Sequence, residues 1–295
     1  MIIVRIRGGL GNQLFQYAFG RNIALRTGAQ LKLDTQTYGR GSSNSYRLNC
    51  FNIKADIATE AEVRRFVGIV QGGFLGRVRR VWRKHIRIGL PHFKRTVIEE
   101  KNMCFDPNIC MMNDNVYLDG YWQTEKYFKD IEHTLREELQ LVPAPNDWNR
   151  ILQDKINDTD SVSIHIRRGD YLLPSTYKVH GVCPLEYYRA AVDQLTVEVK
   201  QPHFFVFSDD PEWARDNLQF DYPITYIDHN GGDKDYEDLR LMSTCKHHII
   251  ANSTFSWWGA WLCSNTEKIV ISPKKWFNHS PNDSKDLIPE TWRRI

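Results

Sequence analysis

The sequence predicts an α/β protein made of two lobes, each with a parallel sheet. Short apolar runs alternate with helical patterns along most of the 295 residues, and this alternation is typical of right-handed βαβ units. Two prolines within residues 143–146 interrupt the pattern near the middle of the chain, because proline cannot continue a helix. The length also suits two domains better than one. We therefore expect one lobe over residues 1–145 and another over residues 146–295.

The first half opens with the order strand, loop, helix, strand. The expected elements are a strand at 2–6, a tight loop at 8–11, a helix at 12–26 and a strand at 30–33. Glycine at position 28 is a suitable helix stop, and the helix has a periodic apolar face. That face would consist of Leu14, Tyr17, Ala18, Ala24 and Leu25. A strand at 116–118 and an amphipathic helix at 126–139 complete this half.

The second half alternates more regularly. The expected strands are 161–166, 203–207, 224–227, 247–251 and 268–271. The expected helices are 185–199, 211–217, 236–244 and 255–263. Ligands bind at the carboxyl ends of the strands in such sheets, so the polar motifs that follow these strands are the candidates for a functional site.

Composition and cysteine usage exclude several classes of protein. Hydrophobic residues at 41% and charged residues at 25% are ordinary values for a folded protein. The six cysteines are scattered without a C-x-x-C pair, so we expect reduced thiols and neither a zinc site nor a disulfide framework. No signal peptide is visible before the first strand, and no window approaches the ~18 apolar residues of a membrane span. We expect a cytoplasmic protein.

The net charge of +3 conceals a local basic segment. No acidic residue lies between Glu62 and Glu99, where ten lysines and arginines occur, so the rest of the chain is net acidic. This distribution does not favour a nucleic-acid-binding protein. Within the segment, Arg77–Arg87 has a helical apolar face surrounded by cations, which predicts peripheral contact with an anionic membrane at its inner face. A solvated helix packed on the core explains the pattern equally well.

The motif His165-Ile166-Arg167-Arg168-Gly169-Asp170 follows the first strand of the second half. A guanidinium group binds phosphate oxygens through two parallel hydrogen bonds and stays charged, so it can also stabilise a departing diphosphate. Successive strand residues point to opposite faces. We therefore expect one arginine to bind phosphate and the other to pair with an acid such as Asp170, although a structural ion pair explains the motif as well.

Two further motifs follow neighbouring strands. Ser208 and Asp209 suit a ribose hydroxyl or a guanine edge, while an acid here would also cap the helix at 211–217. Ser253 and Thr254 begin another helix, whose unpaired N–H groups and positive end favour phosphate. The tryptophans that follow, Trp257, Trp258 and Trp261, are expected in the core. The acid pairs at 209–210 and at 233 and 235 are weak metal signals, and we expect no metal.

The glycine loop at 8–11 differs from a dinucleotide-binding loop. Leu14 occupies the position of the third glycine in G-x-G-x-x-G, which argues against an oxidoreductase. The glycines would let a substrate approach the backbone, and the side-chain amides of Asn12 and Gln13 would orient hydroxyl groups. A plain tight turn is an equally good interpretation.

Together these motifs resemble those of the α-1,2-fucosyltransferases, glycosyltransferase family 11. The matching segments are residues 8–17, 165–171, 207–210 and 252–258, with residues 120–128 similar to a further family pattern. Each motif is a modest signal alone, but the four in this order are highly specific. The similarity spans nearly the whole chain.

The resemblance implies a GT-B-type architecture of two Rossmann-like lobes. GDP-β-L-fucose would lie in the C-terminal lobe and the acceptor in the cleft between the lobes, and Arg167 would contact the diphosphate. The other implied donor-binding residues are His165, Arg168, Asp170, Ser208, Asp209, Ser253, Thr254 and Phe255. The acceptor-side residues would be Gln13, Tyr121, Trp122 and Gln123. The family inverts configuration without a metal or another cofactor.

The implied reaction moves fucose to the 2-hydroxyl of a terminal galactose, on a glycan such as a lipid-linked O-antigen unit. Arg167 and the helix start at Ser253 would stabilise the leaving diphosphate, and Asn12 would orient the acceptor. Asp119, at the end of a predicted strand, is the candidate base. The alternatives are a fucosyltransferase of another linkage, such as α-1,6, and a sugar-nucleotide-binding protein without catalysis. Paired strand-end arginines beside a helix start favour an enzyme.

Overall fold

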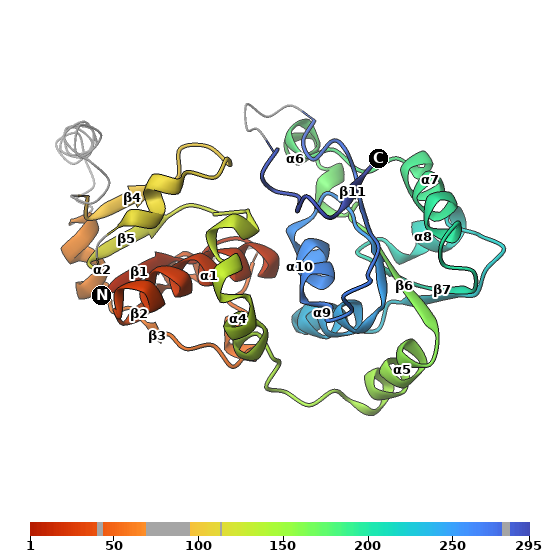
Figure 1. The fold of residues 1–295 in the computed structure, drawn as a ribbon, viewed down its shortest axis with the longest axis horizontal. Helices are drawn as coiled ribbons and strands as arrows, with labels where there is room; N and C mark the ends of the chain where they lie inside the picture. The colour runs from red at the N-terminus through yellow and green to blue at the C-terminus, as the bar shows by residue number, and fades with distance from the viewer. Residues whose placement is uncertain (40–43, 69–94, 113, 279–283) are drawn as a thin grey trace. The chain divides into compact units, whose positions relative to one another are not determined.

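The computed structural model describes residues 1–39, 44–68, 95–112, 114–278 and 284–295. The chain divides into two compact units, Met1–Gln140 and Leu141–Ile295. The division falls just before the proline pair at which we placed the boundary. Each unit has a sheet with helices packed on it (Figure 1), and every described strand pairing is parallel. The predicted α/β class is confirmed.

The first unit contains a five-stranded sheet in the order β3-β2-β1-β5-β4. Its strands are β1 (Ile2–Arg5), β2 (Leu31–Asp34), β3 (Asp56–Ile57), β4 (Val97–Glu99) and β5 (Val116–Asp119). Its α-helices are α1 (Leu10–Thr27), α2 (Glu60–Val67) and α4 (Glu132–Glu138). Short 3₁₀ helices connect them, namely η1 (Gln36–Tyr38), η2 (Leu48–Cys50), η4 (Pro107–Met111), η5 (Glu125–Tyr127) and η6 (Lys129–Ile131). The predicted strand-loop-helix-strand opening is present.

Helix α1 follows its prediction closely. It ends at Gly28, whose left-handed φ of 66° is the usual conformation at a helix C-terminus. Four of the five predicted apolar-face residues are buried, but Leu25 is 41% exposed. The prediction that Leu25 lies on the buried face was therefore wrong, because the last turn of α1 is largely exposed.

The helix predicted at 126–139 is wrong in its first half. Two 3₁₀ turns occupy this stretch, and regular α-helix begins only at Glu132. Phe128 has a φ of −148°, which no helix allows. Both Tyr127 and Phe128 are buried. The extended φ of Phe128 and the burial of both rings indicate that core packing overrides the helical pattern here.

The first sheet is covered on both faces. Alternate residues of a strand point to opposite sides, and Ile3 and Tyr117 pack with Val63 and Phe66 of α2. Val4 points the other way and is also buried. Within the described residues no helix combines the length and apolar character needed to cross a membrane. The basic stretch Arg77–Arg87 lies outside the described residues.

The second unit contains a six-stranded sheet in the order β11-β10-β9-β6-β7-β8. Its strands are β6 (Asp160–Ile166), β7 (Pro202–Ser208), β8 (Ile224–Ile227), β9 (His247–Ile249), β10 (Val270–Ser272) and β11 (Arg293–Arg294). Its helices are α5 (Asp147–Asn157), α6 (Pro174–Val179), α7 (Leu185–Thr196), α8 (Pro211–Asn217), α9 (Asp235–Thr244) and α10 (Thr254–Leu262), with the 3₁₀ turns η7 (Asp170–Leu172) and η8 (Gly232–Lys234). All nine elements predicted for this half are present, whereas α5, α6 and β11 were not predicted.

Strand β7 shows how this sheet is buried on both sides. Phe204 and Val206 join a core cluster with residues of α7 and α8. Phe205 and Phe207 point to the opposite face, where residues of α5 and α9 cover them. Such a strand reads as a continuous apolar run, as expected for a parallel sheet covered by helices on both faces.

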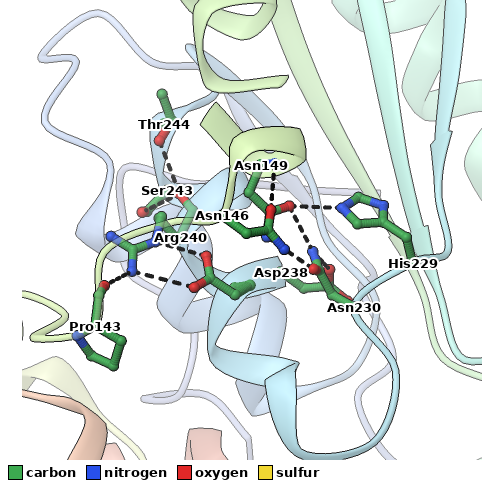
Figure 2. A network of polar contacts seen from close by, with 10 residues as sticks. Pro143, Asn146, Asn149, His229, Asn230, Asp238, Arg240, Ser243 and Thr244 are labelled. Atoms are coloured by element: carbon green, nitrogen blue, oxygen red, sulfur yellow. Dashed lines mark hydrogen bonds and ion pairs between the residues drawn. The ribbon is translucent and has the colours of Figure 1, made fainter. Parts of the chain in front are cut away.

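A polar network attaches helix α5 to this unit (Figure 2). Asn149 of α5 donates to Asn230 at 2.9 Å and accepts from it at 3.1 Å, and His229 lies 2.7 Å from the Asn149 oxygen. Asn230 also donates to Asp238 of α9 at 3.0 Å. Burial raises the pKa of Asp238 to about 7, with Asp235 and Glu237 adding to the effect. The network therefore holds a carboxyl that keeps its proton well above the ordinary range.

Candidate active site

Each sheet has a switch point, where the strand order reverses beside the first strand. In the second unit β7 and β8 lie on one side of β6, and β9, β10 and β11 lie on the other. In the first unit β2 and β3 lie on one side of β1, and β5 and β4 on the other. Ligands of open α/β sheets bind outside the strand carboxyl ends at such points. The motifs singled out in the sequence follow the strands that flank both switch points.

Arg167 follows β6 and forms the exposed part of the C-terminal switch point. Its Nη2 lies 2.5 Å from Asp170 and its Nη1 3.2 Å from Asp209. About a third of the side chain is exposed. Two carboxylates therefore hold a guanidinium group at the strand edge, where an anion can exchange for either of them.

Arg168 is more deeply placed. Its Nε lies 3.0 Å from Asp210, and its guanidinium covers the ring of Trp213 at 4.0 Å. We expected only one arginine to pair with an acid, and this was wrong. Both do, and Asp170 pairs with Arg167, the arginine implied for phosphate. The Arg168 side chain is less exposed than that of Arg167, 18% against 34%, and its guanidinium lies closer to an aromatic ring than that of Arg167, which is 5.4 Å from the Tyr171 ring. The structure therefore favours a structural role for Arg168.

The end of β7 supports the arginines. Asp209 accepts the Arg168 backbone N–H at 2.8 Å in addition to its ion pair with Arg167. This use of both carboxylate oxygens argues against Asp209 as a direct reader of guanine. Ser208 accepts the backbone N–H of Asp210 at 2.9 Å, and Asp210 caps α8 by accepting from Trp213 N at 3.3 Å. The predicted cap is confirmed, and Ser208 serves the same turn.

The other side of the switch point is the start of α10. Ser253 caps the helix by accepting the Phe255 N–H at 3.3 Å, and Thr254 is the first helical residue. Asn252 anchors the turn, since its buried amide donates to the carbonyls of His180, Gly181 and Trp276. The three tryptophans of this helix are buried as predicted. An anchored helix start beside Arg167 has the chemistry of an anion site.

His165 lies beneath this surface at the end of β6. Its side chain is buried, and its ring centroid is 5.6 Å from that of Phe255. Burial lowers the pKa of His165 to about 3, and the charge of Arg167 acts in the same direction. The imidazole is therefore neutral at physiological pH. It can donate or accept one hydrogen bond but adds no positive charge.

The N-terminal switch point joins two loops through their side-chain amides. Gln123, after β5, donates to the Asn12 oxygen at 2.7 Å. Gly8 has a φ of 80°, and a Cβ there would lie 2.6 Å from Asn12 Nδ2, so this position requires glycine. Gln13 is buried and donates to the carbonyls of Gly8 and Ser45. Its amide therefore holds the loop together, and its role on the acceptor side stays a prediction.

Two arginines at the N-terminal switch point, Arg5 and Arg7, contact Asp119, and Arg7 also contacts Tyr121. The guanidinium of Arg7 lies over the Tyr121 ring at 4.5 Å. Asp119 lies 3.0 Å from Arg5 and 3.4 Å from Arg7. Proton uptake by Asp119 would weaken both ion pairs, which argues against this residue as the base. Trp122 is fully buried, and its contact with the acceptor stays a prediction.

Sequence reasoning missed several residues around the two switch points. The N-terminal switch point has Arg5, Arg7 and Glu100 nearby, and at the C-terminal one the ring of Trp213 supports Arg168. The apolar pair Val97-Ile98 directly before two glutamates could have indicated that a strand ends here. No group of three or more His, Cys, Asp and Glu side chains suited to a metal ion occurs within the described ranges.

Comparison with known proteins assigns a family to this arrangement. The model of the family described as "Glycosyl transferase family 11" matches residues 97–295. An α-1,2-colitosyltransferase of Escherichia coli is 35% identical over 305 residues, covering 100% of this chain and 99% of its own. The O-antigen biosynthesis glycosyltransferase WbnK of Escherichia coli is 33% identical, covering 97% and 98%. Human galactoside α-(1,2)-fucosyltransferase 1 is 31% identical over 103 residues, which are 34% of this chain and 28% of that protein.

Solved structures agree on the fold. The α-1,6-fucosyltransferase NodZ, known from Bradyrhizobium, gives a TM-score of 0.54 at 14% identity, covering 88% of this chain and 91% of that one. At this identity the likeness shows the fold alone, and it confirms the predicted GT-B-type architecture of two parallel-sheet units. From the family model and the full-length relatives, the chain belongs to glycosyl transferase family 11.

Proposed function

We propose that this glycosyltransferase moves L-fucose from GDP-β-L-fucose to the 2-hydroxyl of a terminal galactose, with inversion at the anomeric carbon. The observation that carries the proposal is the pairing of Arg167 with the start of α10 across the C-terminal switch point. A cation and a helix terminus at one strand edge suit a leaving diphosphate. The names of the human and bacterial α-1,2 transferases favour this linkage over α-1,6.

The donor would bind at the C-terminal switch point. Its diphosphate would displace Asp170 or Asp209 from Arg167, so these carboxylates position the guanidinium before the donor arrives. Thr254 and the backbone N–H groups at the start of α10 would receive the other phosphate oxygens. Phe255 would line the neighbouring surface, with the neutral imidazole of His165 buried beneath it. Negative charge that develops on GDP as the sugar leaves is then stabilised by groups already in place.

The acceptor would bind at the N-terminal switch point. Asn12 and Gln123 form an amide pair, and side-chain amides suit the hydroxyl groups of a sugar. The half-exposed ring of Tyr121, held against Arg7, offers an apolar face for a sugar ring. A galactose-terminated glycan, such as a lipid-linked O-antigen unit, is the acceptor class we propose. The name of the relative WbnK supports this class.

Colitose is a second candidate donor sugar, because the relative that covers the whole chain at 35% identity is named a colitosyltransferase. Colitose is fucose without its 3-hydroxyl group, so the two donors differ by one hydrogen-bonding position. A site built to bind that hydroxyl would reject the deoxy sugar strongly, whereas an apolar site would not discriminate well. We also propose that transfer needs no metal or other cofactor.

The deciding experiment is a transfer assay with the full chain and a galactose-terminated acceptor, with EDTA present. GDP-fucose, GDP-colitose, GDP-mannose and UDP-galactose are compared, and product linkage is determined by NMR. We expect a fucosylated product with an α-1,2 linkage and no effect of EDTA. A preference for GDP-colitose would select the second candidate. Tightest calorimetric binding to the uridine nucleotide, or loss of activity with EDTA, would contradict the assignment.

A membrane-associated place of action is a separate proposal from the sequence of Arg77–Arg87. Its cations around an apolar stripe suit an anionic lipid surface, where a lipid-linked acceptor would be presented. Co-sedimentation with anionic liposomes tests this, using a variant in which Arg79, Arg80, Arg83 and Lys84 are neutralised. Equal sedimentation of this variant and the parent protein would refute the proposal.

A further inference from the structure

Glu100 directly follows β4, the edge strand beside β5, and contacts the loop after β5 that flanks the N-terminal switch point. Its two carboxylate oxygens accept backbone N–H groups of the β5 loop, Oε2 from Tyr121 at 2.7 Å and Oε1 from Trp122 at 3.0 Å. Each oxygen retains a second lone pair, and the side chain is only partly buried. The carboxylate is thus fixed in orientation by the same loop that carries Tyr121 and Gln123.

The loop that holds Glu100 is conformationally unusual. Trp122 has a φ of 57°, a left-handed conformation that is costly for a residue with a bulky side chain. A Cβ at Gly120 would lie 2.5 Å from Glu100 Cβ and 2.7 Å from Trp122 Cε2, so these three residues are packed with no space for a methyl group. The indole Nε1, bonded to that Cε2, is buried with no hydrogen-bond partner among the described residues. Such strain and an unsatisfied donor are typical of functional sites.

The neighbouring acids are less suited to accept a proton. Asp119 is paired with two arginines. Asp34 is buried and accepts hydrogen bonds from the Tyr117 hydroxyl at 2.7 Å and from Gln36 N. Glu99 is exposed and still belongs to β4. Glu100 alone among these four combines partial exposure, fixed orientation and hydrogen bonds from neutral N–H groups.

We propose that Glu100 is the catalytic base that accepts the proton of the acceptor hydroxyl. This inference rests on the proposed function. In the step, the acceptor oxygen forms a bond to the anomeric carbon and its proton passes to a Glu100 oxygen. The bond from the anomeric carbon to the diphosphate oxygen breaks, and its electron pair leaves with GDP. Charge and atoms balance without a further reactant.

The charges around Glu100 fit this role. Burial raises the pKa of Glu100, and the negative charge of Asp119 acts in the same direction. The N–H groups of Tyr121 and Trp122 and the charge of Arg7 oppose the shift. A carboxylate with a raised pKa is a stronger base while it remains ionised near neutral pH. Since it must be ionised to act, turnover should fall as the pH drops through this raised pKa.

The test compares Glu100→Gln with Glu99→Gln, a matched change at the adjacent exposed position. We expect kcat of Glu100→Gln to fall by ~10²-fold or more, the usual contribution of a general base. The acid limb of its pH–rate profile should disappear, while calorimetric GDP affinity stays near that of the parent protein. Thermal stability should fall modestly, because the glutamine oxygen can replace only one of the two acceptors of the Tyr121 and Trp122 N–H groups. Glu99→Gln should retain parent kcat.

Chemical rescue provides a second, independent measurement. Formate supplied to Glu100→Ala should restore part of the lost turnover, because it can occupy the vacated space and accept the proton. Near-parent kcat in Glu100→Gln, a loss confined to the acceptor KM, or no rescue by formate would overturn the assignment. If the parent protein itself transfers no sugar from any GDP donor, the proposed function fails instead, so the two failures are distinguishable.

Discussion

The two switch points share a topology but differ in chemistry. At the C-terminal one, guanidinium groups and a helix start converge, with carboxylates that hold the arginines in place. At the N-terminal one, the amides of Asn12 and the buried Gln123 are bonded to each other near the partly buried Tyr121, and the arginines are directed to Asp119 and an aromatic ring. The first suits an anion and the second suits neutral hydroxyl groups. Under the proposed function, the same sheet architecture would serve donor and acceptor through different strand-end residues.

Among the substitutions that distinguish the two switch points, Arg167→Lys is expected to have the largest effect on turnover. Lysine keeps the charge but loses the planar fork that binds two phosphate oxygens, so turnover should fall by ~10²-fold. Steady-state kinetics with GDP-fucose measures this. Arg215→Lys is the matched control, since Arg215 of α8 pairs with Asp228 and not with the two acids that hold Arg167. Unchanged turnover in Arg167→Lys would remove this residue from the mechanism.

A substitution at Gly120 should damage the N-terminal edge through its packing. The methyl group of Gly120→Ala would lie within 2.8 Å of both Glu100 and Trp122, and the neighbouring loop must shift. We expect stability to fall by ~2 kcal/mol, as for other overpacked sites, and the acceptor KM to rise. Thermal unfolding and kinetics measure the two effects. If neither changed, the tight packing around Glu100 would be wrong.

Removal of the amide pair should affect the acceptor and spare the donor. Gln123→Leu leaves the Asn12 oxygen without its donor, so the acceptor KM should rise by about tenfold, equivalent to ~1.4 kcal/mol. Gln140→Leu, at an exposed position of the same unit, is the control. An increase in the KM for the donor instead would contradict the assignment of the acceptor to the N-terminal switch point and the donor to the C-terminal one.

The smallest expected effect is on the thermal stability of the second unit. It concerns Asp238, a partly buried carboxyl whose pKa is raised, as is that of Glu100. Because the folded-state pKa of Asp238 is about 7, above its ordinary value, the folded protein keeps a proton that the unfolded chain releases. Its contribution is therefore present at low pH and lost as the pH rises from about 4 to about 7. Asp238→Asn imitates the protonated form and should gain thermal stability over the parent across this range. A pH-independent difference would contradict the shifted pKa.

The sequence was more informative for the second unit than for the first. Between β6 and β10 each strand and helix except α6 forms one uninterrupted pattern, and the strand-end motifs lie where parallel topology requires. In the first unit, β4 follows a long basic stretch without a clear pattern, so Glu100 was not placed beside Asp119. The partners of the arginines also depended on tertiary packing, since Asp209 and Asp210 reach them from a different strand. Spacing alone does not reveal such pairings.

The central claim, that the C-terminal switch point binds the nucleotide and the N-terminal one binds the acceptor, is tested most directly by calorimetric titration of GDP. The parent protein, Arg167→Lys and Gln123→Leu would be compared under identical salt conditions. We predict that Arg167→Lys loses about tenfold in GDP affinity, equivalent to ~1.4 kcal/mol, while Gln123→Leu binds as the parent does. Equal losses in both variants, or a loss only in Gln123→Leu, would contradict this division of roles.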